Sequence, residues 1–325
     1  MSEPRVAVVV PVRDRRDLLR ALLQALDAQT FREFEVVVVD DGSSDGSDVE
    51  AETTTVAGRP VRVVHQDGAG AVAARELGVN KAEADVIAFT DSDCEPDPDW
   101  LTAGIAAVDA GADMAHGRTI PARPMRPLER SVGAGDEGLF PTCNAFYTRA
   151  GFDRAGGFDR EAARRLGFRM NARARGLGFG EDTLLGWRVH RSGGDVRYAP
   201  DAVVRHHVFP PDFRDWVSRC WMAAAFPALI AEAPELRPRL VRRRVQFGER
   251  TRLPMYATGA ALLARRPKLA AVAAGWWAFS RWRELRTTDA TTEEQLVALP
   301  QELALDVVTG AALVVGSVRA RTLLI

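Results

Sequence analysis

Residues 86–93 read VIAFTDSD, an apolar run that ends in two aspartates. Four apolar residues without alternation are typical of a strand buried on both faces of a parallel sheet. A helical stripe from Leu18 to Leu26 lies between two such strands, and we expect Asp14 to cap this helix. Three earlier runs have the same strand character: residues 6–10, 35–39 and 61–64. Repeated strand–helix units predict a doubly wound, mostly parallel α/β sheet.

The composition is that of an ordinary globular protein, with 325 residues, 46% of them hydrophobic and 27% charged. The 43 Lys and Arg nearly balance the 44 Asp and Glu, so no global field favours nucleic acid as a partner. Three widely spaced cysteines form neither a disulfide framework nor a zinc cluster, and they favour a reducing cytoplasm. The first apolar run is too short for a secretory signal, and no window reaches the roughly 20 apolar residues that span a bilayer.

Asp91 and Asp93 are two residues apart, so in an extended segment both carboxylates point to the same side. They follow a buried strand, where open α/β sheets bind ligands. With few cationic residues nearby in the sequence, two such carboxylates repel each other unless a cation lies between them. Oxygen ligands suit Mn²⁺ or Mg²⁺, which complete their shell with water and substrate phosphate. The alternative is a solvated acidic turn, since Glu95, Asp97 and Asp99 follow closely.

Two further motifs stand after predicted strands. Residues 40–45 read DDGSSD, in which Asp40 or Asp41 can accept hydrogen bonds from ribose hydroxyls or a base N–H. The same residue types also make turns and helix caps, and both interpretations can hold. Residues 68–73 read GAGAVA and match the dinucleotide pattern G-x-G-x-x-A. They follow the third strand rather than the first, however, and small residues there equally suit helix–sheet packing.

A third acidic motif begins a predicted helix at 181–191. Residues 180–188 read GEDTLLGWR, with Glu181 and Asp182 in the first turn, where the helix dipole stabilises carboxylates. Capping explains one acid better than two, and a carboxylate at a helix start can also accept a proton from a hydroxyl nucleophile. His206 and His207 end a later predicted strand. Imidazole together with carboxylates suits Mn²⁺, although a lone histidine is more often structural.

In this order, the motifs resemble those of the family 2 glycosyltransferases, which have the GT-A fold. The resemblance runs from about Val6 to His207, two thirds of the chain, and includes PVRD at 11–14, Arg75 and GGFD at 156–159. We expect a GT-A domain at residues 1–215, with a nucleotide-sugar half at about 1–95 and an acceptor half at about 96–215.

The resemblance implies a role for each matching residue. The donor would bind among Pro11, Val12, Arg13, Asp14, Asp40, Asp41, Arg75, Asp91 and Ser92. Mn²⁺ or Mg²⁺ would be held by Asp93, Asp91 and either His206 or His207. Asp182 would be the general base, and the acceptor would meet Glu181, Trp187 and Arg188. The implied reaction moves a sugar from a nucleoside-diphosphate sugar to a hydroxyl acceptor (a saccharide, a lipid-linked compound or a small molecule) with inversion.

The remainder, residues 216–325, has the pattern of helices, with an arginine-rich stretch from Arg237 to Arg252 and tryptophans at 276, 277 and 282. Tryptophan at headgroup depth and arginine on anionic lipid are typical of a segment on the inner face of a membrane. The same patch could instead bind a polyprenyl-phosphate acceptor. A helical bundle with tryptophan in its core explains the residues equally well.

Two other functions compete with glycosyl transfer. A nucleotidyltransferase has a similar sheet but tends to carry a glycine-rich loop after the first strand, and residues 11–17, PVRDRRD, contain no glycine. A catalytically inactive scaffold that binds sugar nucleotides would have lost one of the acidic motifs, and none is missing.

Overall fold

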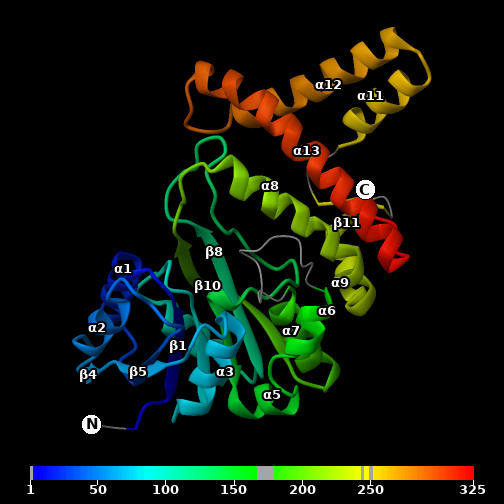
Figure 1. Cartoon of the computed structure of the whole chain (residues 1–325). Helices are drawn as coiled ribbons and strands as arrows, with labels where there is room; N and C mark the ends of the chain where they lie inside the picture. The colour runs from blue at the N-terminus through cyan, green and yellow to red at the C-terminus, as the bar shows by residue number, and fades with distance from the viewer. Residues whose placement is uncertain (1–2, 167–178, 243–244, 249–251) are drawn as a thin grey trace. The chain divides into compact units, whose positions relative to one another are not determined.

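The computed structural model describes residues 3–166, 179–242, 245–248 and 252–325. These residues fall into two compact units (Figure 1). Residues 3–122, 131–165 and 179–207 form the first unit, and residues 123–130 and 208–325 form most of the second.

An eight-stranded sheet forms the centre of the first unit, in the order β5-β2-β1-β6-β9-β8-β10-β7. The first four strands in this order are parallel, and β9 is antiparallel to both of its neighbours. Strand β10 is parallel to β8 and antiparallel to β7. The strands are β1 (Val6–Val12), β2 (Phe34–Asp40), β5 (Arg62–His65), β6 (Val86–Phe89), β7 (Cys94–Pro96), β8 (Met114–Pro121), β9 (Ala145–Thr148) and β10 (Val196–His206). A separate hairpin pairs β3 (Thr55–Val56) with β4 (Arg59–Pro60).

Helices cover both faces of this sheet (Figure 1). Val8 and Val10 of β1 lie in one core with the leucine stripe of α1, whereas Val37 and Val39 of β2 pack on the opposite face with Ala74 of α3. The helices of this unit are α1 (Arg16–Asp27), α2 (Ser47–Glu52), α3 (Ala71–Lys81), α4 (Trp100–Asp109), α5 (Arg149–Arg154), α6 (Arg160–Leu166) and α7 (Glu181–Arg191), with a 3-10 turn η1 (Thr142–Asn144). The predicted doubly wound, mostly parallel α/β sheet is confirmed.

The expected capping role of Asp14 is wrong. Asp14 has a φ of 48°, and its carboxylate accepts a hydrogen bond from the backbone N of Ser44 at 2.8 Å. The first turn of α1 is capped instead by the loop after β2, where Asp45 Oδ2 accepts from the backbone N of Arg16 at 2.9 Å. The DDGSSD motif therefore ties the end of β2 to the start of the neighbouring helix.

The second unit is mainly helical, as expected. Its helices are α8 (Phe213–Trp221), α9 (Phe226–Glu232), α10 (Arg237–Leu240), α11 (Leu253–Leu263), α12 (Pro267–Leu285) and α13 (Thr292–Ala320), with 3-10 turns η3 (Met222–Ala225) and η4 (Pro234–Leu236). A short antiparallel pair joins β11 (Val241–Arg242) to β12 (Gln246–Phe247).

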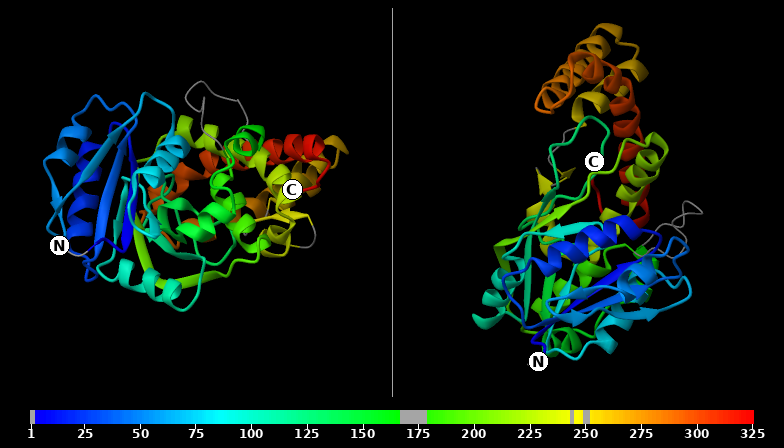
Figure 2. Two further views of the ribbon diagram at one scale, coloured as in Figure 1. Left: turned by 90° about the horizontal axis from the view of Figure 1, so that it is seen from below. Right: turned by 90° about the vertical axis from the view of Figure 1, so that its left-hand side faces the viewer.

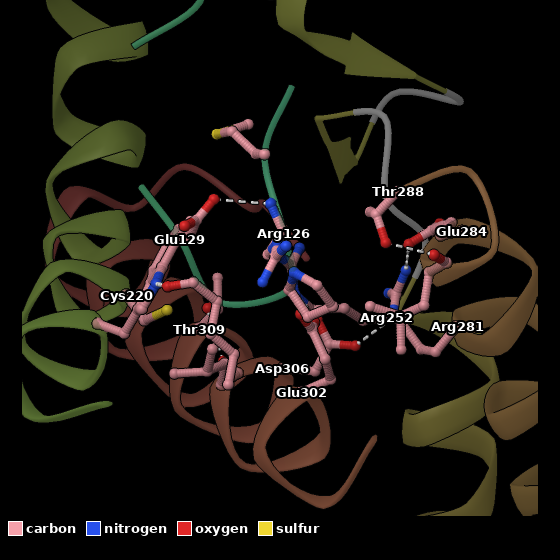
Figure 3. A pocket seen from close by; sticks show the side chains of 16 residues that line it. Arg126, Glu129, Cys220, Arg252, Arg281, Glu284, Thr288, Glu302, Asp306 and Thr309 are labelled. Carbon is pink, nitrogen blue, oxygen red and sulfur yellow. Dashed lines mark hydrogen bonds and ion pairs between the residues drawn. The ribbon is translucent and has the colours of Figure 1, made fainter. Parts of the chain in front are cut away.

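The expectation that no segment is long and apolar enough to span a bilayer is wrong for one helix. Among the described residues, α13 has the length and apolar composition that would allow it to cross a membrane. Near its middle, however, Asp306 is buried and accepts hydrogen bonds from Arg281 Nε at 2.8 Å and Trp277 Nε1 at 3.0 Å. Arg252 Nε lies 3.3 Å from the other oxygen of the same carboxylate. Figure 3 shows Arg252, Arg281 and Asp306 at the wall of a cavity of about 330 Å³. Such a paired charge is typical of a helix packed inside its own unit.

The arginine-rich stretch is therefore not a uniform surface patch. Arg252 is largely buried against Asp306, and Arg243, Arg244 and Arg250 lie outside the described residues.

Gly78 of α3 lies against β1, and a Cβ added to it would stand 2.4 Å from Val9 Cγ1. We expect Gly78→Ala to lower the free energy of unfolding by about 1–3 kcal/mol through overpacking. Gly275→Ala in α12 is the control, because nothing lies within 4 Å of its added Cβ. The control should keep or slightly raise stability, since alanine favours helix. Urea unfolding followed by circular dichroism measures both, and equal midpoints would contradict the close packing of α3.

Candidate functional site

The candidate site lies at the carboxyl ends of the parallel strands β2, β1 and β6. Val12 pairs with Asp40 and Val9 pairs with Phe89, so the residues that follow these strands meet at one edge of the sheet. Open α/β sheets bind their ligands at this edge.

Asp41 is buried at this edge and is held by the turn before α3. Its carboxylate accepts hydrogen bonds from Gln66 Nε2 at 2.6 Å and from the backbone N of Gly70 at 3.1 Å. Gly70 has a φ of 91°, which favours glycine. Arg13 Nη1 lies 3.8 Å from Asp41 Oδ2. The GAGAVA turn thus presents the backbone N–H of Gly70 to the carboxylate of Asp41. Its dinucleotide-like pattern did not predict this contact.

The other predicted donor residues differ in exposure. Asp40 is buried and its carboxylate accepts from the backbone N of Ser43 at 3.2 Å. Val12 and Ser92 are also buried, Pro11 is half-buried, and Arg13 and Asp14 are exposed.

Asp91 pairs with Arg75, a buried arginine of α3, and Arg75 Nη2 lies 2.5 Å from Asp91 Oδ1. Burial opposes the charge on this guanidinium, but the carboxylates of Asp91, Glu181 and Asp182 outweigh it and raise the pKa of Arg75. The fold therefore places the acidic residues after β6 and those at the start of α7 close enough to interact electrostatically with the same arginine, Arg75.

The pairing of β7 with β10 brings Asp93 to the histidine doublet. His207 donates its backbone N–H to the carbonyl of Asp93 at 2.8 Å, and His206 Nε2 lies 3.6 Å from Asp93 Oδ1. His206 Nδ1 is 2.9 Å from the carbonyl oxygen of His207. Because a carbonyl can only accept, Nδ1 donates this hydrogen bond, and Nε2 is the ring nitrogen on the side of Asp93. The ring of His206, rather than that of His207, thus faces the carboxylate.

The pair of Asp93 and His206 fits a divalent cation. Asp93 Oδ1 is buried and has no hydrogen-bond partner among the described residues. A buried carboxylate oxygen almost always has a partner, and a cation that binds both this oxygen and the imidazole nitrogen would supply one.

Two features near this pair differ from expectation. Although few cationic residues are near in the sequence, the fold supplies two from distant positions: Asp93 Oδ2 pairs with Arg15, just as Asp91 pairs with Arg75. In addition, the Sγ of Cys94 lies within 4.8 Å of a carboxylate oxygen of Asp93 and of a ring nitrogen of His206. Its hydrogen bond with Cys143 and its burial raise the pKa of the thiol well above the usual range. Since only the thiolate is a good ligand, Cys94 is a poor one here.

Glu181 and Asp182 begin α7, directly after Gly180 with its φ of 73°. Asp182 Oδ1 accepts from the backbone N of Thr183 at 2.7 Å. Burial first, and then the charge of Glu181, raise the pKa of Asp182 to about 7. A carboxylate with this pKa can take up a proton at neutral pH.

Several buried polar atoms near these carboxylates have no hydrogen-bond partner within the described ranges: Thr90 Oγ1, Asp93 Oδ1, Arg75 Nε and Tyr147 Oη. Burial, and then the charge of Asp182, raise the pKa of Tyr147, which places this phenol near the carboxylate. Such a group of atoms marks a place where a ligand can supply the missing partners. Sequence reasoning did not identify Arg15, Thr90 or Tyr147, because no motif marks single residues of these types.

Trp187 and Arg188 are held by neighbouring loops. Trp187 is buried, and its Nε1 donates to the carbonyl of Gly138 at 3.1 Å. Arg188 donates to the carbonyl of Gly157 and lies 3.5 Å from Asp159 Oδ2. Direct contact of either residue with an acceptor stays a prediction.

Residues 7–158 match the family model described as Glycosyl transferase family 2. Glycosyltransferase AglE of Haloferax volcanii is 30% identical over 118 residues, which are 35% of this chain and 39% of that protein. Pre-mycofactocin glycosyltransferase of Mycobacterium tuberculosis is 28% identical over 237 residues, 67% of this chain and 46% of the relative. The chain thus spans less than half the length of these curated relatives.

Two solved structures share the fold. Mannosyltransferase PcManGT from Pyrobaculum calidifontis, in complex with GDP-Man and Mn²⁺, has a TM-score of 0.55 at 19% identity, over 99% of this chain and 88% of that one. S. aureus TarS 1-349, in complex with UDP-GlcNAc, has a TM-score of 0.51 at 16% identity, over 98% and 92%. At such identities the likeness concerns the fold alone. Together with the family match over residues 7–158, it supports a glycosyl transferase family 2 domain with the GT-A fold in the first unit.

Proposed function

We propose that the protein transfers a sugar from a nucleoside-diphosphate sugar to a hydroxyl acceptor, with inversion at the anomeric carbon. The observation that carries this proposal is the environment of Asp182. Its pKa is about 7, and its charge interacts with Arg75, the partner of Asp91. Displacement of a nucleoside diphosphate by a hydroxyl needs a base of this kind beside a donor site. The nucleotide sugars named with PcManGT and TarS support the choice of donor.

On the donor side, Asp41 would accept hydrogen bonds from the base or ribose, with Pro11, Val12, Arg13, Asp14 and Asp40 around it. Arg75 would hold Asp91 toward the ribose and diphosphate, next to Ser92. Arg13 and Arg15 are at least partly exposed beside buried carboxylates, and they would face the phosphates. Cations at this edge attract the negatively charged leaving group.

The metal would be Mn²⁺ or Mg²⁺, held by Asp93 and His206 with Asp91 close by. When bound, it would neutralise the charge that develops on the departing diphosphate. The hydrogen bond from His206 Nδ1 to the carbonyl of His207 would fix the ring for this task. The proposal assigns His207 a backbone role only.

On the acceptor side, Asp182 would accept the hydroxyl proton while the oxygen forms its bond to the anomeric carbon. The bond from that carbon to the diphosphate oxygen breaks in the same displacement, so the configuration inverts. Glu181 would orient the acceptor beside the base, with Trp187 and Arg188 holding the surrounding loops.

The pH dependence of turnover tests the base. We expect kcat/KM to rise with pH up to about 7, because Asp182 must lose its proton before it can accept another. Glu181→Gln removes a like charge that raises this pKa, so the acidic limb of the profile should move to lower pH. Glu95→Gln, an exposed acid of β7, is the control and should leave the limb in place. A profile that is flat across neutral pH would remove Asp182 as the base.

Release of nucleoside diphosphate from a panel of donors with Mn²⁺ tests the reaction itself. A nucleotidyltransferase would release no UDP or GDP from these donors, and an inactive scaffold would bind them without turnover.

The acceptor is proposed as a saccharide, a lipid-linked compound or a small molecule. The cytoplasmic location expected from Cys94, Cys143 and Cys220 stays a prediction.

A further inference from the structure

Helices α11 and α12 pack on each other as a hairpin at one end of the second unit (Figure 1 and Figure 2). Its side chains stand mostly in solvent: α11 has no buried residue, and from 257 to 276 only Ala270 is buried. Large apolar side chains gather around the turn between the two helices. They are exposed by 61% to 89% and comprise Leu262, Leu263, Leu269, Val272 and Trp276.

Soluble proteins rarely leave several large apolar side chains together in water, and such a surface usually marks a site of interaction. The base of the hairpin, in contrast, is anchored. Trp277 and Arg281 of α12 are buried and bind Asp306 of α13. The neighbouring tryptophans therefore have opposite environments: Trp277 belongs to the core, and Trp276 is exposed at the surface.

Around its turn, the hairpin carries charge of only one sign. No Asp or Glu stands between Leu253 and Arg283, whereas Arg265, Arg266 and Lys268 surround the turn and are exposed. Exposed leucines next to arginine and lysine, with a tryptophan about two helical turns away, are the elements of an interfacial membrane site.

We propose that the α11–α12 hairpin binds the surface of a bilayer that contains anionic lipids. Leu262, Leu263 and Leu269 enter the acyl boundary, Trp276 lies at headgroup depth, and the three cations of the turn contact lipid phosphates. A second copy of the chain is disfavoured as the occupant, because a two-fold contact through this turn would set cations against cations. This proposal does not rest on the catalytic roles above.

The hairpin lies on the membrane rather than across it. Helix α11 has 11 residues. At a rise of about 1.5 Å per residue this is roughly 16 Å, about half of the hydrocarbon thickness of a bilayer. The apolar side chains at the turn can therefore enter only one leaflet.

Sedimentation of the full chain with vesicles tests the proposal. The chain should bind phosphatidylcholine vesicles that contain phosphatidylglycerol more strongly than vesicles of phosphatidylcholine alone. Leu262→Glu with Leu263→Glu should weaken binding at least about tenfold, because it removes the inserted side chains. Arg265→Glu, Arg266→Glu and Lys268→Glu together should abolish the preference for phosphatidylglycerol. Val49→Glu, at a valine that is 54% exposed on α2, is the matched control and should bind like the wild type.

Two further measurements check that the variants fold and that a membrane, rather than a second copy of the chain, covers the hairpin. Both hairpin variants change exposed residues only, so nucleotide binding and circular dichroism should match the wild type. The proposal is overturned if the wild type binds neither kind of vesicle, or if the double leucine variant binds as the wild type does. It is also overturned if light scattering finds a dimer that this variant dissociates and no vesicle binding, which would make a second copy the occupant.

Discussion

Replacing Asp182 with asparagine should lower kcat by about 10²–10⁴-fold and leave the affinity for nucleoside diphosphate nearly unchanged. Asparagine keeps the size of the side chain and can still accept the hydrogen bond from the backbone N of Thr183. It cannot take up a proton, so the acceptor hydroxyl would have to attack without a base. Initial rates of nucleotide release and calorimetric binding of the nucleotide separate the two effects.

The control for Asp182 is Asp17→Asn. Asp17 also stands in the first turn of a helix, α1, but its side chain is 91% exposed. This variant loses a similar helix-dipole interaction and should keep its turnover. Full activity in Asp182→Asn would refute the proposed base. An equal loss of nucleotide binding in that variant would instead assign Asp182 to the donor site.

Replacing Asp93 with alanine should abolish the effect of Mn²⁺ on nucleotide binding and lower kcat/KM by at least about 10²-fold. Asp93 is the carboxylate whose buried oxygen lies 3.6 Å from His206 Nε2. Calorimetric titrations of nucleoside diphosphate with and without Mn²⁺ measure this coupling directly. In the wild type Mn²⁺ should tighten binding, and in Asp93→Ala the two titrations should coincide.

The histidine doublet supplies a matched pair of variants for this test. His206→Ala removes the ring that faces Asp93, whereas His207→Ala keeps the backbone N–H that binds the Asp93 carbonyl. His206→Ala should therefore weaken the Mn²⁺ effect and His207→Ala should not. The reverse result would assign the ligand to His207, and an Mn²⁺ effect that survives in Asp93→Ala would remove this metal site.

The strands of the parallel half could be predicted because their sequences leave little choice. β1, β2 and β6 are short runs of apolar residues that only a sheet covered on both faces can bury. β7 could not be predicted in this way. It has three residues, Cys94–Pro96, with an exposed acid in the middle, and its pairing depends on β10 more than one hundred positions later.

The motifs of the site could be located in the sequence, but their partners could not. The guanidiniums beside Asp91 and Asp93 come from α3 and from the loop after β1, so no inspection of the sequence near Asp93 reveals them. Asp14 and Asp45 are both good capping residues, and only the approach of two loops decides which one caps α1. Helical periodicity alone likewise could not separate Trp276 from Trp277.

The pairing of β7 with β10 also sets the order in which the protein can mature during synthesis. Strands β1, β2, β5 and β6 leave the ribosome early and can pair with one another, because all four precede residue 90. β7 emerges soon afterwards, but its partner in the sheet is the last of the eight strands. Asp93 therefore meets His206 only when almost two thirds of the chain has been made. A nascent chain shorter than this would have the edge of the sheet at which the donor is proposed to bind, but it would lack His206 of the proposed metal site.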